Sequence, residues 1–289
     1  MEPSAREQAI IILRADKRHK EIPGLPKVSW QPEFVRRVPD DFRPGRHILH
    51  EEGVYYVLDF SSIFAASPMM MLQGPATKEW RVLDMCAAPG GKSVFAWKTL
   101  QPELIAANET IRKRTGALIE NFTRCQITGS CVWSADPSVW SDRFYQEFDL
   151  VIVDAPCSGQ SLLAKGQEAP GCFSPQMIDM NVGRQRRIVG NAARCVRPGG
   201  WMLYSTCTFS RKENEKVIEW ALAQYPEFEA VEVPFLAEYR STLSNVPCYR
   251  LFPQQGLGAG AFTCLMRHTG ESPEDRSALD IPAYWRYPD

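Results

Sequence analysis

Short strand-like runs alternate with helical segments from Trp80 onward, and few folds accommodate such a pattern. A helix is predicted between the strand-like runs at 149–154 and 201–205, because Ser174 and Pro175 form a helix start and later apolar residues recur near helical spacing. Pro198 and the two glycines after it end this helix. The strand-like runs are residues 81–85, 104–108, 149–154 and 201–205. The alternation is typical of an α/β chain with helices on both faces of a parallel sheet.

The remaining segments predict one main domain with two flanking parts. Ser210 and Glu213 form a capping-box pattern, which predicts a second helix beginning three residues after Cys207. The later apolar runs predict an antiparallel pair at a sheet edge: residues 228–233 and 261–266. We predict a small N-terminal module, a main domain and a C-terminal tail, with these bounds: 1–75, 76–268 and 269–289.

Composition excludes several classes of protein. Nine cysteines without paired C-x-x-C spacing indicate neither a disulfide framework nor a metal site, which predicts a reducing, cytoplasmic environment. The N-terminal apolar run Ala9–Leu13 is too short to span a bilayer, so no membrane association is expected. The net charge of -1 does not argue strongly against a nucleic-acid partner, because phosphate binding needs only local positive charge. Five arginines form such a cluster, although an ordinary solvated surface would look the same: Arg184, Arg186, Arg187, Arg194 and Arg197.

A glycine-rich turn follows the first predicted strand, in the segment VLDMCAAPGGKS (82–93). Such a turn lets backbone N–H groups and a helix N-terminus approach a polar ligand closely. Glu109 ends the next strand, at the spacing where a carboxylate binds the ribose hydroxyls of an adenosine cofactor. The GGKS ending also suggests a nucleotide-phosphate loop, but that pattern requires Gly where this chain has Cys86. We therefore reject a nucleoside triphosphatase.

Two cysteines lie directly beyond strand ends, in the segments DAPCSG (154–159) and YSTCTF (204–209). Ligands of open α/β sheets bind at the carboxyl ends of the strands, so Cys157 and Cys207 are candidates for chemistry. By contrast, Cys195 and Cys264 lie within apolar runs and are interpreted as small buried hydrophobes.

Together, the glycine-rich turn and the two cysteine segments resemble three motifs of the Sun-type (Fmu-type) RNA cytosine-5 methyltransferase family. The resemblance extends over about residues 50–268, through 107–114, Lys165, Gln185 and the closing segment 252–262. Among the subgroups it is most similar to the bacterial RsmF-type ribosomal RNA enzymes. This resemblance implies a Rossmann-like, S-adenosylmethionine-dependent methyltransferase fold with a seven-stranded, mostly parallel sheet and an antiparallel edge.

The resemblance implies that Cys207 is the nucleophile. Carbon 5 of cytosine is too weak a nucleophile to accept a methyl group directly, so a thiolate must first add to carbon 6. The resemblance implies that Cys157 assists release of the product, that Asp154 contacts the nitrogen 3 edge of the base, and that Lys165 orients the cytidine or its phosphate. A surface lysine is an equally good interpretation of Lys165. The group that removes the carbon 5 proton is left open.

Nucleophilic attack by Cys207 requires a thiolate. A thiol with a pKa near 8.5 is only about 3% ionised at pH 7, whereas a pKa of about 7 would ionise half of it. The predicted helix start at Ser210 would place a positive dipole end beside Cys207, and we predict that it supplies part of this pKa shift.

The resemblance also implies the cofactor, S-adenosylmethionine, and no metal. It places Glu109 on the ribose, Arg114 and Asp136 on the ribose and adenine sides, and Asp154 beside the cofactor as well as the base. The methionine part of the cofactor is expected against the seven residues of the turn: Cys86, Ala87, Ala88, Pro89, Gly90, Gly91 and Lys92.

Several alternatives lose support from the sequence. DNA methylation of this type uses a Glu-Asn-Val motif that does not occur here, amine methylation would need an aromatic residue where Cys157 stands, and the histidines lie outside the cysteine motifs of any protease. A catalytically silent RNA-binding assembly factor ranks below the enzyme, since it would not need both cysteines in motif context. Two departures from the family pattern affect the choice of RNA: Ala164 replaces an arginine and Gly260–Phe262 reads GAF.

The expected partner is RNA, with ribosomal RNA favoured over transfer RNA. The N-terminal module is a candidate RNA contact, and no C-terminal RNA-binding domain is expected after residue 268. A monomer is expected, and whether a partner protein supplies additional RNA affinity is left open. The target base must be unstacked to reach Cys207.

Overall fold

The computed structural model describes residues 7–72, 79–271, 276 and 278–288. The predicted boundary between the N-terminal module and the main domain, at residues 75 and 76, lies outside these ranges. None of the helices in the described residues is both long and apolar enough to cross a bilayer.

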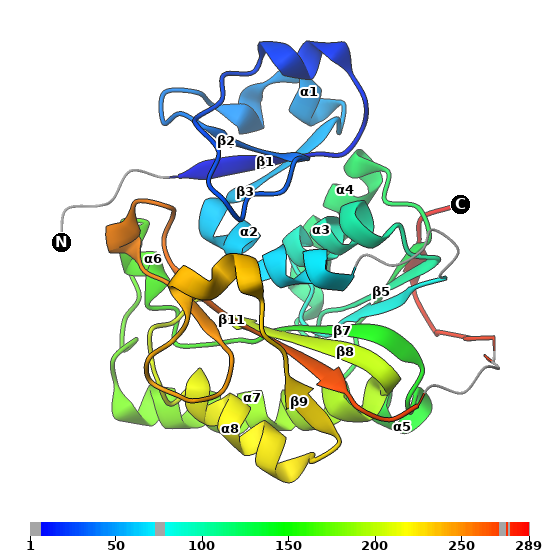
Figure 1. Cartoon of the computed structure of the whole chain (residues 1–289). Coiled ribbons are helices and arrows are strands. Elements are labelled where there is room, and N and C mark those ends of the chain that lie inside the picture. Colours follow the sequence, from blue (N-terminus) through cyan, green and yellow to red (C-terminus); the bar gives the residue numbers. More distant parts are fainter. Residues whose placement is uncertain (1–6, 73–78, 272–275, 277, 289) are drawn as a thin grey trace.

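The described part of the main sheet has nine strands, and its centre is parallel (Figure 1). The five parallel strands, in sheet order, are β8 (Val196–Thr206), β7 (Phe148–Asp154), β4 (Arg81–Asp84), β5 (Leu104–Asn108) and β6 (Ser130–Trp133). From β4 the chain adds β5 and β6 on one side and then returns to add β7 and β8 on the other. The connections that follow β4 and β7 therefore run in opposite directions. Open α/β sheets bind their ligands at the carboxyl ends of two such neighbouring strands, where the connections diverge.

The antiparallel edge is built on β11 (Ala261–His268), which pairs with β8. The opposite side of β11 is shared by two short strands, β9 (Phe228–Ala230) and β10 (Tyr249–Leu251). The predicted antiparallel edge is thus confirmed. When β9 and β10 are counted as one strand, the sheet from this edge to β6 has the predicted seven strands. At the other edge, β12 (Trp285–Arg286) of the predicted tail pairs with β6 as a further strand that the sequence did not indicate.

Alternating side chains of the strands enter two separate hydrophobic clusters, one on each face of the sheet. On β4, for example, Val82 packs in one cluster and Leu83 in the other, as the two-residue period of a strand requires. The first face is covered by α2 (Phe60–Ala66), α3 (Gly91–Leu100) and α4 (Thr115–Cys125). The second is covered by α5 (Pro137–Arg143), α7 (Pro175–Cys195) and α8 (Glu215–Gln224).

The N-terminal residues form a small sheet of three antiparallel strands above the first face (Figure 1). Its strands, in sheet order, are β2 (Val35–Val38), β1 (Gln8–Ile12) and β3 (Tyr55–Asp59). Ala9 and Ile11 of β1 pack into the main core, whereas Ile10 packs with α1 (Ile48–Glu51) in a small cluster of its own. Asp59 then caps α2 by accepting a hydrogen bond from the Ser61 N–H at 3.0 Å. The chain thereby passes directly from the small sheet into the main domain.

The two predicted helices have different outcomes. The predicted start of α7 is confirmed, since Ser174 caps it and accepts a hydrogen bond from the Met177 N–H. The predicted start of the second helix is wrong, because α8 begins at Glu215 rather than after Ser210. The carboxylate of Glu213 does not complete a capping box but contacts Ser158, more than fifty residues earlier in the chain.

Short helical pieces complete the described structure. One is α6 (Ser161–Ala164), which directly follows the first cysteine segment. The others are 3-10 helices at Lys17–Glu21, Pro44–Arg46, Ser67–Leu72, Arg112–Arg114, Pro234–Tyr239 and Pro253–Gln255.

Candidate active site

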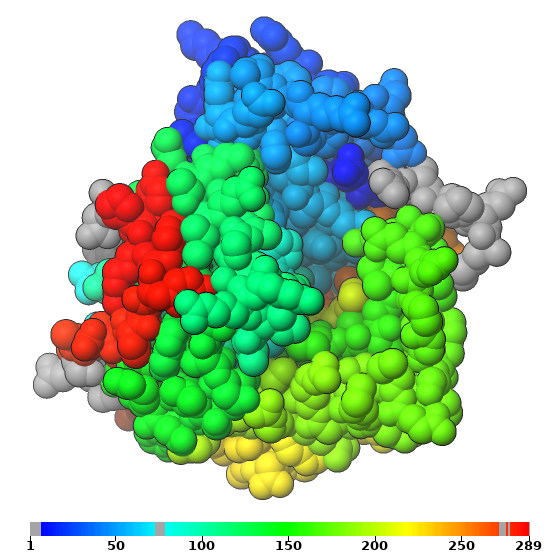
Figure 2. Space-filling view, turned by 180° about the vertical axis from the view of Figure 1, so that it is seen from behind, coloured from blue at the N-terminus to red at the C-terminus, as the bar shows by residue number. Residues whose placement is uncertain are grey.

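A cavity of about 600 Å³ opens at the carboxyl ends of the parallel strands, where the connections after β4 and β7 diverge. The space-filling view shows a hollow there, bounded by the blue N-terminal residues, the teal residues after β5 and the yellow-green residues around α6 and α7 (Figure 2). Of the predicted site residues, nine line it: Cys86, Ala88, Lys92, Glu109, Arg114, Asp154, Cys157, Lys165 and Cys207. The fold thus gathers both cysteine segments and the glycine-rich turn around one space.

The glycine-rich turn is held by a buried carboxyl at the end of β4. Asp84 accepts hydrogen bonds from the Ser93 hydroxyl at 2.6 Å and the Cys86 N–H at 3.3 Å. Burial raises the pKa of this carboxyl to about 7. Gly90 has a φ of 113°, and a Cβ there would approach Leu118 at 3.1 Å, so this position favours glycine. Ala87, Pro89, Gly90 and Gly91 therefore shape the turn and the start of α3, while Cys86, Ala88 and Lys92 face the cavity.

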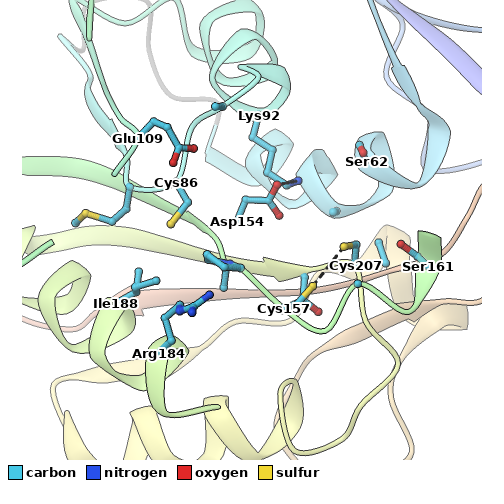
Figure 3. Close-up of a pocket in the computed structure, with 18 of the residues that line it drawn as sticks. Ser62, Cys86, Lys92, Glu109, Asp154, Cys157, Ser161, Arg184, Ile188 and Cys207 are labelled. Carbon is cyan, nitrogen blue, oxygen red and sulfur yellow. Dashed lines mark hydrogen bonds and ion pairs between the residues drawn. The ribbon is translucent and has the colours of Figure 1, made fainter. Parts of the chain in front are cut away.

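Lys92 and Asp154 form an ion pair inside the cavity. The Lys92 Nζ lies 2.6 Å from Asp154 Oδ2, and the Ser205 hydroxyl donates to Asp154 Oδ1 at 2.8 Å. In Figure 3 the Asp154 carboxylate lies between Cys86 and the Cys157–Cys207 pair. Both carboxylate oxygens are thereby fixed at the end of β7, where the carboxylate can meet ligands on either side.

Glu109 and Arg114 form the second charged pair at the cavity. Glu109 is buried and accepts a hydrogen bond from the Ile111 N–H at 2.9 Å. The Arg114 guanidinium lies 3.0 Å from Glu109 Oε2 and donates to the Ala88 carbonyl at 2.8 Å. Arg114 therefore connects the carboxylate after β5 to the glycine-rich turn after β4.

Asp136 lies beside the cavity rather than in its lining. It caps α5 by accepting from the Ser138 N–H at 3.0 Å, and the Arg187 guanidinium donates to both of its oxygens at 2.8 Å. Burial opposes ionisation of this carboxyl, but the bonds from Arg187 and Ser138 outweigh it and lower the pKa of Asp136. Pro137, the next residue, and Arg187 do line the cavity. Asp136 therefore holds Arg187 and the start of α5 at the edge of the cavity.

The two cysteines after β7 and β8 are in contact. The sulfur atoms of Cys157 and Cys207 are 3.3 Å apart, and Cys207 is the exposed member of the pair (Figure 3). The hydrogen bond from Cys157 lowers the pKa of Cys207 to about 7, with support from the Ser161 hydroxyl and the Lys92 charge. The same bond and burial raise the pKa of Cys157 well above its ordinary value. At pH 7, therefore, about half of Cys207 is thiolate, and Cys157 remains the thiol that donates to it.

The lowered pKa of Cys207 agrees with the sequence prediction, but its predicted source is wrong. The prediction assigned part of the shift to a helix dipole at Ser210, whereas α8 begins only at Glu215. The principal cause is the thiol of Cys157, a residue fifty positions earlier in the chain. A contact between such distant residues depends on the parallel pairing of β7 with β8.

The basic cluster predicted on α7 is divided between two places. Arg184 and Arg187 line the cavity, together with Lys165 after α6. The Lys165 Nζ lies 3.5 Å from Asp59 Oδ2, so this lysine also joins the cavity to the N-terminal residues. Arg197, by contrast, pairs with Asp149 at the opposite end of β7. The cavity thus has a positively charged rim made by three side chains.

A group of buried polar residues behind the cysteines was not recognised as functional in the sequence. Glu213 is fully buried and accepts from the Ser158 N–H at 2.8 Å and the Ser158 hydroxyl at 2.6 Å. The Gln185 amide donates to Glu213 and to the Pro156 carbonyl, at 3.0 Å in each case. Motif context alone pointed to Gln185, and the capping-box pattern of Glu213 concealed its long-range contacts.

Comparison with known proteins gives consistent results. Residues 69–267 match the family model described as 16S rRNA methyltransferase RsmB/F. The ribosomal RNA small subunit methyltransferase F of Pectobacterium atrosepticum is 33% identical over 257 residues, and that of Escherichia coli O9:H4 (strain HS) is 32% identical over 268. The alignments cover 86% and 90% of this chain but only 52% and 54% of those proteins. The chain therefore spans about half the length of these curated relatives.

Solved structures share the fold at lower identity. A methyltransferase homolog protein from Pyrococcus horikoshii has a TM-score of 0.74 and 21% identity, covering 90% of this chain and 86% of that one. NSun6 from the same organism, solved with SFG, has a TM-score of 0.70 and 22% identity, covering 82% and 60%. At these identities the similarity establishes the common architecture.

Proposed function

Because the chain belongs to the RsmB/F family of 16S rRNA methyltransferases, we propose that it methylates carbon 5 of a cytidine in ribosomal RNA through a covalent bond to Cys207. The observation that carries this proposal is the contact between Cys157 and Cys207, with sulfur atoms 3.3 Å apart beside the glycine-rich turn. A thiolate at Cys207 and a thiol next to it are the two sulfur species that addition and release require.

The cofactor of this family is S-adenosylmethionine, which supplies the methyl group when bound. The residues present fit it. The buried Glu109 carboxylate matches a pair of ribose hydroxyls, and the exposed apolar side chain of Ile111, next in the cavity lining, matches an adenine face. Cys86, Ala88 and Lys92 border the space between Glu109 and Cys207, where the methionine part would lie. Arg114 holds Glu109 in place for this contact.

The protein's part in the reaction follows from the geometry. The Cys207 sulfur adds to carbon 6 of cytosine. The π electrons of the carbon 5–carbon 6 bond then form a carbon 4–carbon 5 double bond, and those of the nitrogen 3–carbon 4 bond move onto nitrogen 3, so carbon 5 becomes an enamine carbon that can accept the methyl group. Asp154 meets the nitrogen 3 edge, where the developing charge is stabilised by a shared proton, and Lys92 and Ser205 keep its carboxylate oriented. After methylation, a base takes the carbon 5 proton, the electron pair of that C–H bond re-forms the carbon 5–carbon 6 double bond, and the Cys207 sulfur leaves as a thiolate. The Cys157 thiol, 3.3 Å from that sulfur, is placed to donate a hydrogen bond to it as it leaves.

The N-terminal residues are proposed as a module that contacts RNA. Ser61 and Ser62 of α2 line the cavity, and Asp59, just before them, pairs with Lys165 of the cavity lining at 3.5 Å. A nucleotide strand that places its base on Cys207 would therefore pass the N-terminal residues and the positive rim made by Lys165, Arg184 and Arg187. Ribosomal RNA is preferred as substrate because both relatives described above are named ribosomal RNA methyltransferases.

Bisulfite sequencing of ribosomal and transfer RNA, from cells with and without this protein, tests the proposal. We expect protection of a ribosomal cytidine that disappears without the protein and is restored by wild type but not by Cys207→Ala. Protection confined to transfer RNA would reassign the substrate. Equal protection in both strains, together with full retention of RNA binding, would favour a catalytically silent RNA-binding factor.

A further inference from the structure

One fully buried carboxylate, that of Glu213, is shared by the two loops that carry the cysteines. From the β7 side, the backbone N–H of Ser158 donates to it at 2.8 Å and the Ser158 hydroxyl at 2.6 Å. From the β8 side, the Thr208 hydroxyl donates to it at 3.3 Å. From α7, the Gln185 amide donates at 3.0 Å. No cation is among these partners, so the carboxylate depends on hydrogen bonds from the two loops and α7.

The residues bound by Glu213 are the immediate neighbours of the two sulfur atoms. Ser158 follows Cys157, and Thr208 follows Cys207. The two hydroxyls are also 2.8 Å from each other, so they form a closed group with the carboxylate. Gln185 adds a bond to the carbonyl of Pro156, on the other side of Cys157. The backbone around each sulfur is therefore held from the same buried point.

A thiol is a weak hydrogen-bond donor, so its effect on a neighbouring sulfur depends strongly on separation. We propose that Glu213 is a positioning residue for the nucleophile, which holds Cys157 and Cys207 at the distance where one thiol hydrogen-bonds to the other. It does not touch substrate, and it acts through Ser158 and Thr208. The proposal deepens the proposed function, since it concerns the residue that we assign as nucleophile.

The consequence concerns the ionisation of Cys207. The groups that face its sulfur are Cys157, Asp154, Lys92 and Ser161, and Cys157 has the largest effect. If the two loops separate, the bond from Cys157 weakens while Asp154 continues to disfavour the thiolate. The pKa of Cys207 should then rise from about 7 toward that of a free thiol.

The test is the pH dependence of Cys207 alkylation by iodoacetamide in the full chain, followed by mass spectrometry of the peptide that contains it. For Glu213→Gln, we expect the midpoint to rise from about 7 toward about 8.5 and the rate at pH 7 to fall about 10-fold. Glu213→Asp retains the negative charge but shortens the side chain. If the alkylation midpoint of Cys207 also rises in Glu213→Asp, the position of the carboxylate and not its charge causes the effect.

The matched control is Asp149→Asn, which removes a buried carboxylate at the opposite end of β7, where it pairs with Arg197 and Arg276. Asp149→Asn should lower the urea concentration at which half of the protein is unfolded. The pH midpoint of Cys207 alkylation should stay the same as in the wild type. If Glu213→Gln does not fold, Ser158→Ala removes one of the bonds to the carboxylate and should give a smaller rise. The proposal is overturned if folded Glu213 or Ser158 variants keep the wild-type midpoint, or if Asp149→Asn shifts it equally.

This readout does not require methylation. A chain with no methyltransferase activity but with the expected alkylation shifts would contradict the proposed function and leave the positioning role intact. Normal methylation combined with an unshifted alkylation midpoint of Cys207 would support the proposed function and contradict the positioning role of Glu213.

Discussion

The ends of β4 and β8 each present a cysteine to the same cavity, and these two thiols have opposite properties. Burial raises the pKa of Cys86 well above its ordinary value, and the carboxylates of Asp84, Asp154 and Glu109 raise it further. The pKa of Cys207 is lowered to about 7, because Cys157 donates a hydrogen bond to it and Lys92 contributes positive charge. A position beyond a parallel strand therefore brings a thiol to the ligand, but its neighbours decide whether it ionises.

The difference separates the cavity into two halves with different chemistry. At the β4 end, burial and the nearby carboxyl groups of Asp84, Asp154 and Glu109 keep the Cys86 thiol neutral, and the Glu109 carboxylate lines the cavity. At the β8 end, a thiolate faces the space where a base would lie. Asp154 lies between the two and raises the pKa of both thiols, whereas Lys92, its ion-pair partner, lowers the pKa of Cys207.

The largest expected effect comes from removing the thiolate at β8. Cys207→Ala should reduce methylation of ribosomal RNA more than about 1,000-fold, because it removes the thiolate that we assign to add to carbon 6. Transfer of a radiolabelled methyl group measures this. Cys195→Ala, a change at a buried cysteine in the core, is the control and should keep activity while it lowers stability. Residual activity above a few per cent in Cys207→Ala would contradict the assigned nucleophile.

Changing the partner thiol should stop the reaction at a later stage. In Cys157→Ser, the bond to Cys207 forms but elimination is impaired, so a covalent protein–RNA adduct should accumulate and turnover should fall by about 100-fold. A band that survives denaturing gel electrophoresis and disappears after ribonuclease treatment would identify it. The double variant with Cys207→Ala should give no adduct. An adduct in the double variant would mean that a third residue is the nucleophile.

The two thiols should also differ in their reaction with iodoacetamide. The reactive form is the thiolate, so the rate at Cys207 should increase about tenfold per pH unit below 7 and level off above it. At pH 7 about half of Cys207 but less than about 1% of Cys86 is ionised, which predicts at least about a 50-fold difference in rate. Competition mass spectrometry on the folded protein measures the ratio. Equal rates would show that the shared cavity, and not the neighbours, determines reactivity.

Much of this architecture could be predicted from the sequence because it is local. The strands β4, β5, β7 and β8, the start of α7 and the glycine-rich turn each depend on residues adjacent in the chain. The arrival of Cys86, Glu109, Asp154 and Cys207 at one cavity also follows, since parallel strands end at the same edge of the sheet. The short edge strands β10 and β12 have too few residues to produce a recognisable pattern.

What could not be predicted depends on distant contacts. Glu213 has a local pattern that favours a helix cap, but in the folded chain its carboxylate is bound by Ser158 and Gln185. The Ser210 hydroxyl accepts from the Glu213 N–H at 3.4 Å, but α8 begins only at Glu215, farther from Cys207 than predicted. The source of the lowered pKa therefore moves to Cys157. Local propensity gave way because a buried carboxylate must be fully hydrogen-bonded, and its partners lie on other strands.

The smallest effect that we predict concerns the buried carboxyl at the β4 end. Burial raises the pKa of Asp84 to about 7, so its neutral form stabilises the fold below about pH 4 and this contribution is lost as pH rises through 7. Asp84→Asn keeps the shape and cannot ionise, so its free energy of unfolding should fall less than that of wild type between pH 4 and 8, by on the order of 2 kcal/mol. Urea unfolding at several pH values measures this.

The same change, Asp84→Asn, removes one carboxylate beside Cys86 and should lower the pKa of that thiol, whereas the pKa of Cys207 should be unaffected. If the alkylation midpoint of Cys207 moved as well, the two halves of the cavity would be electrostatically linked, and the contrast between the ends of β4 and β8 would have to be replaced by a single shared field centred on Asp154 and Lys92.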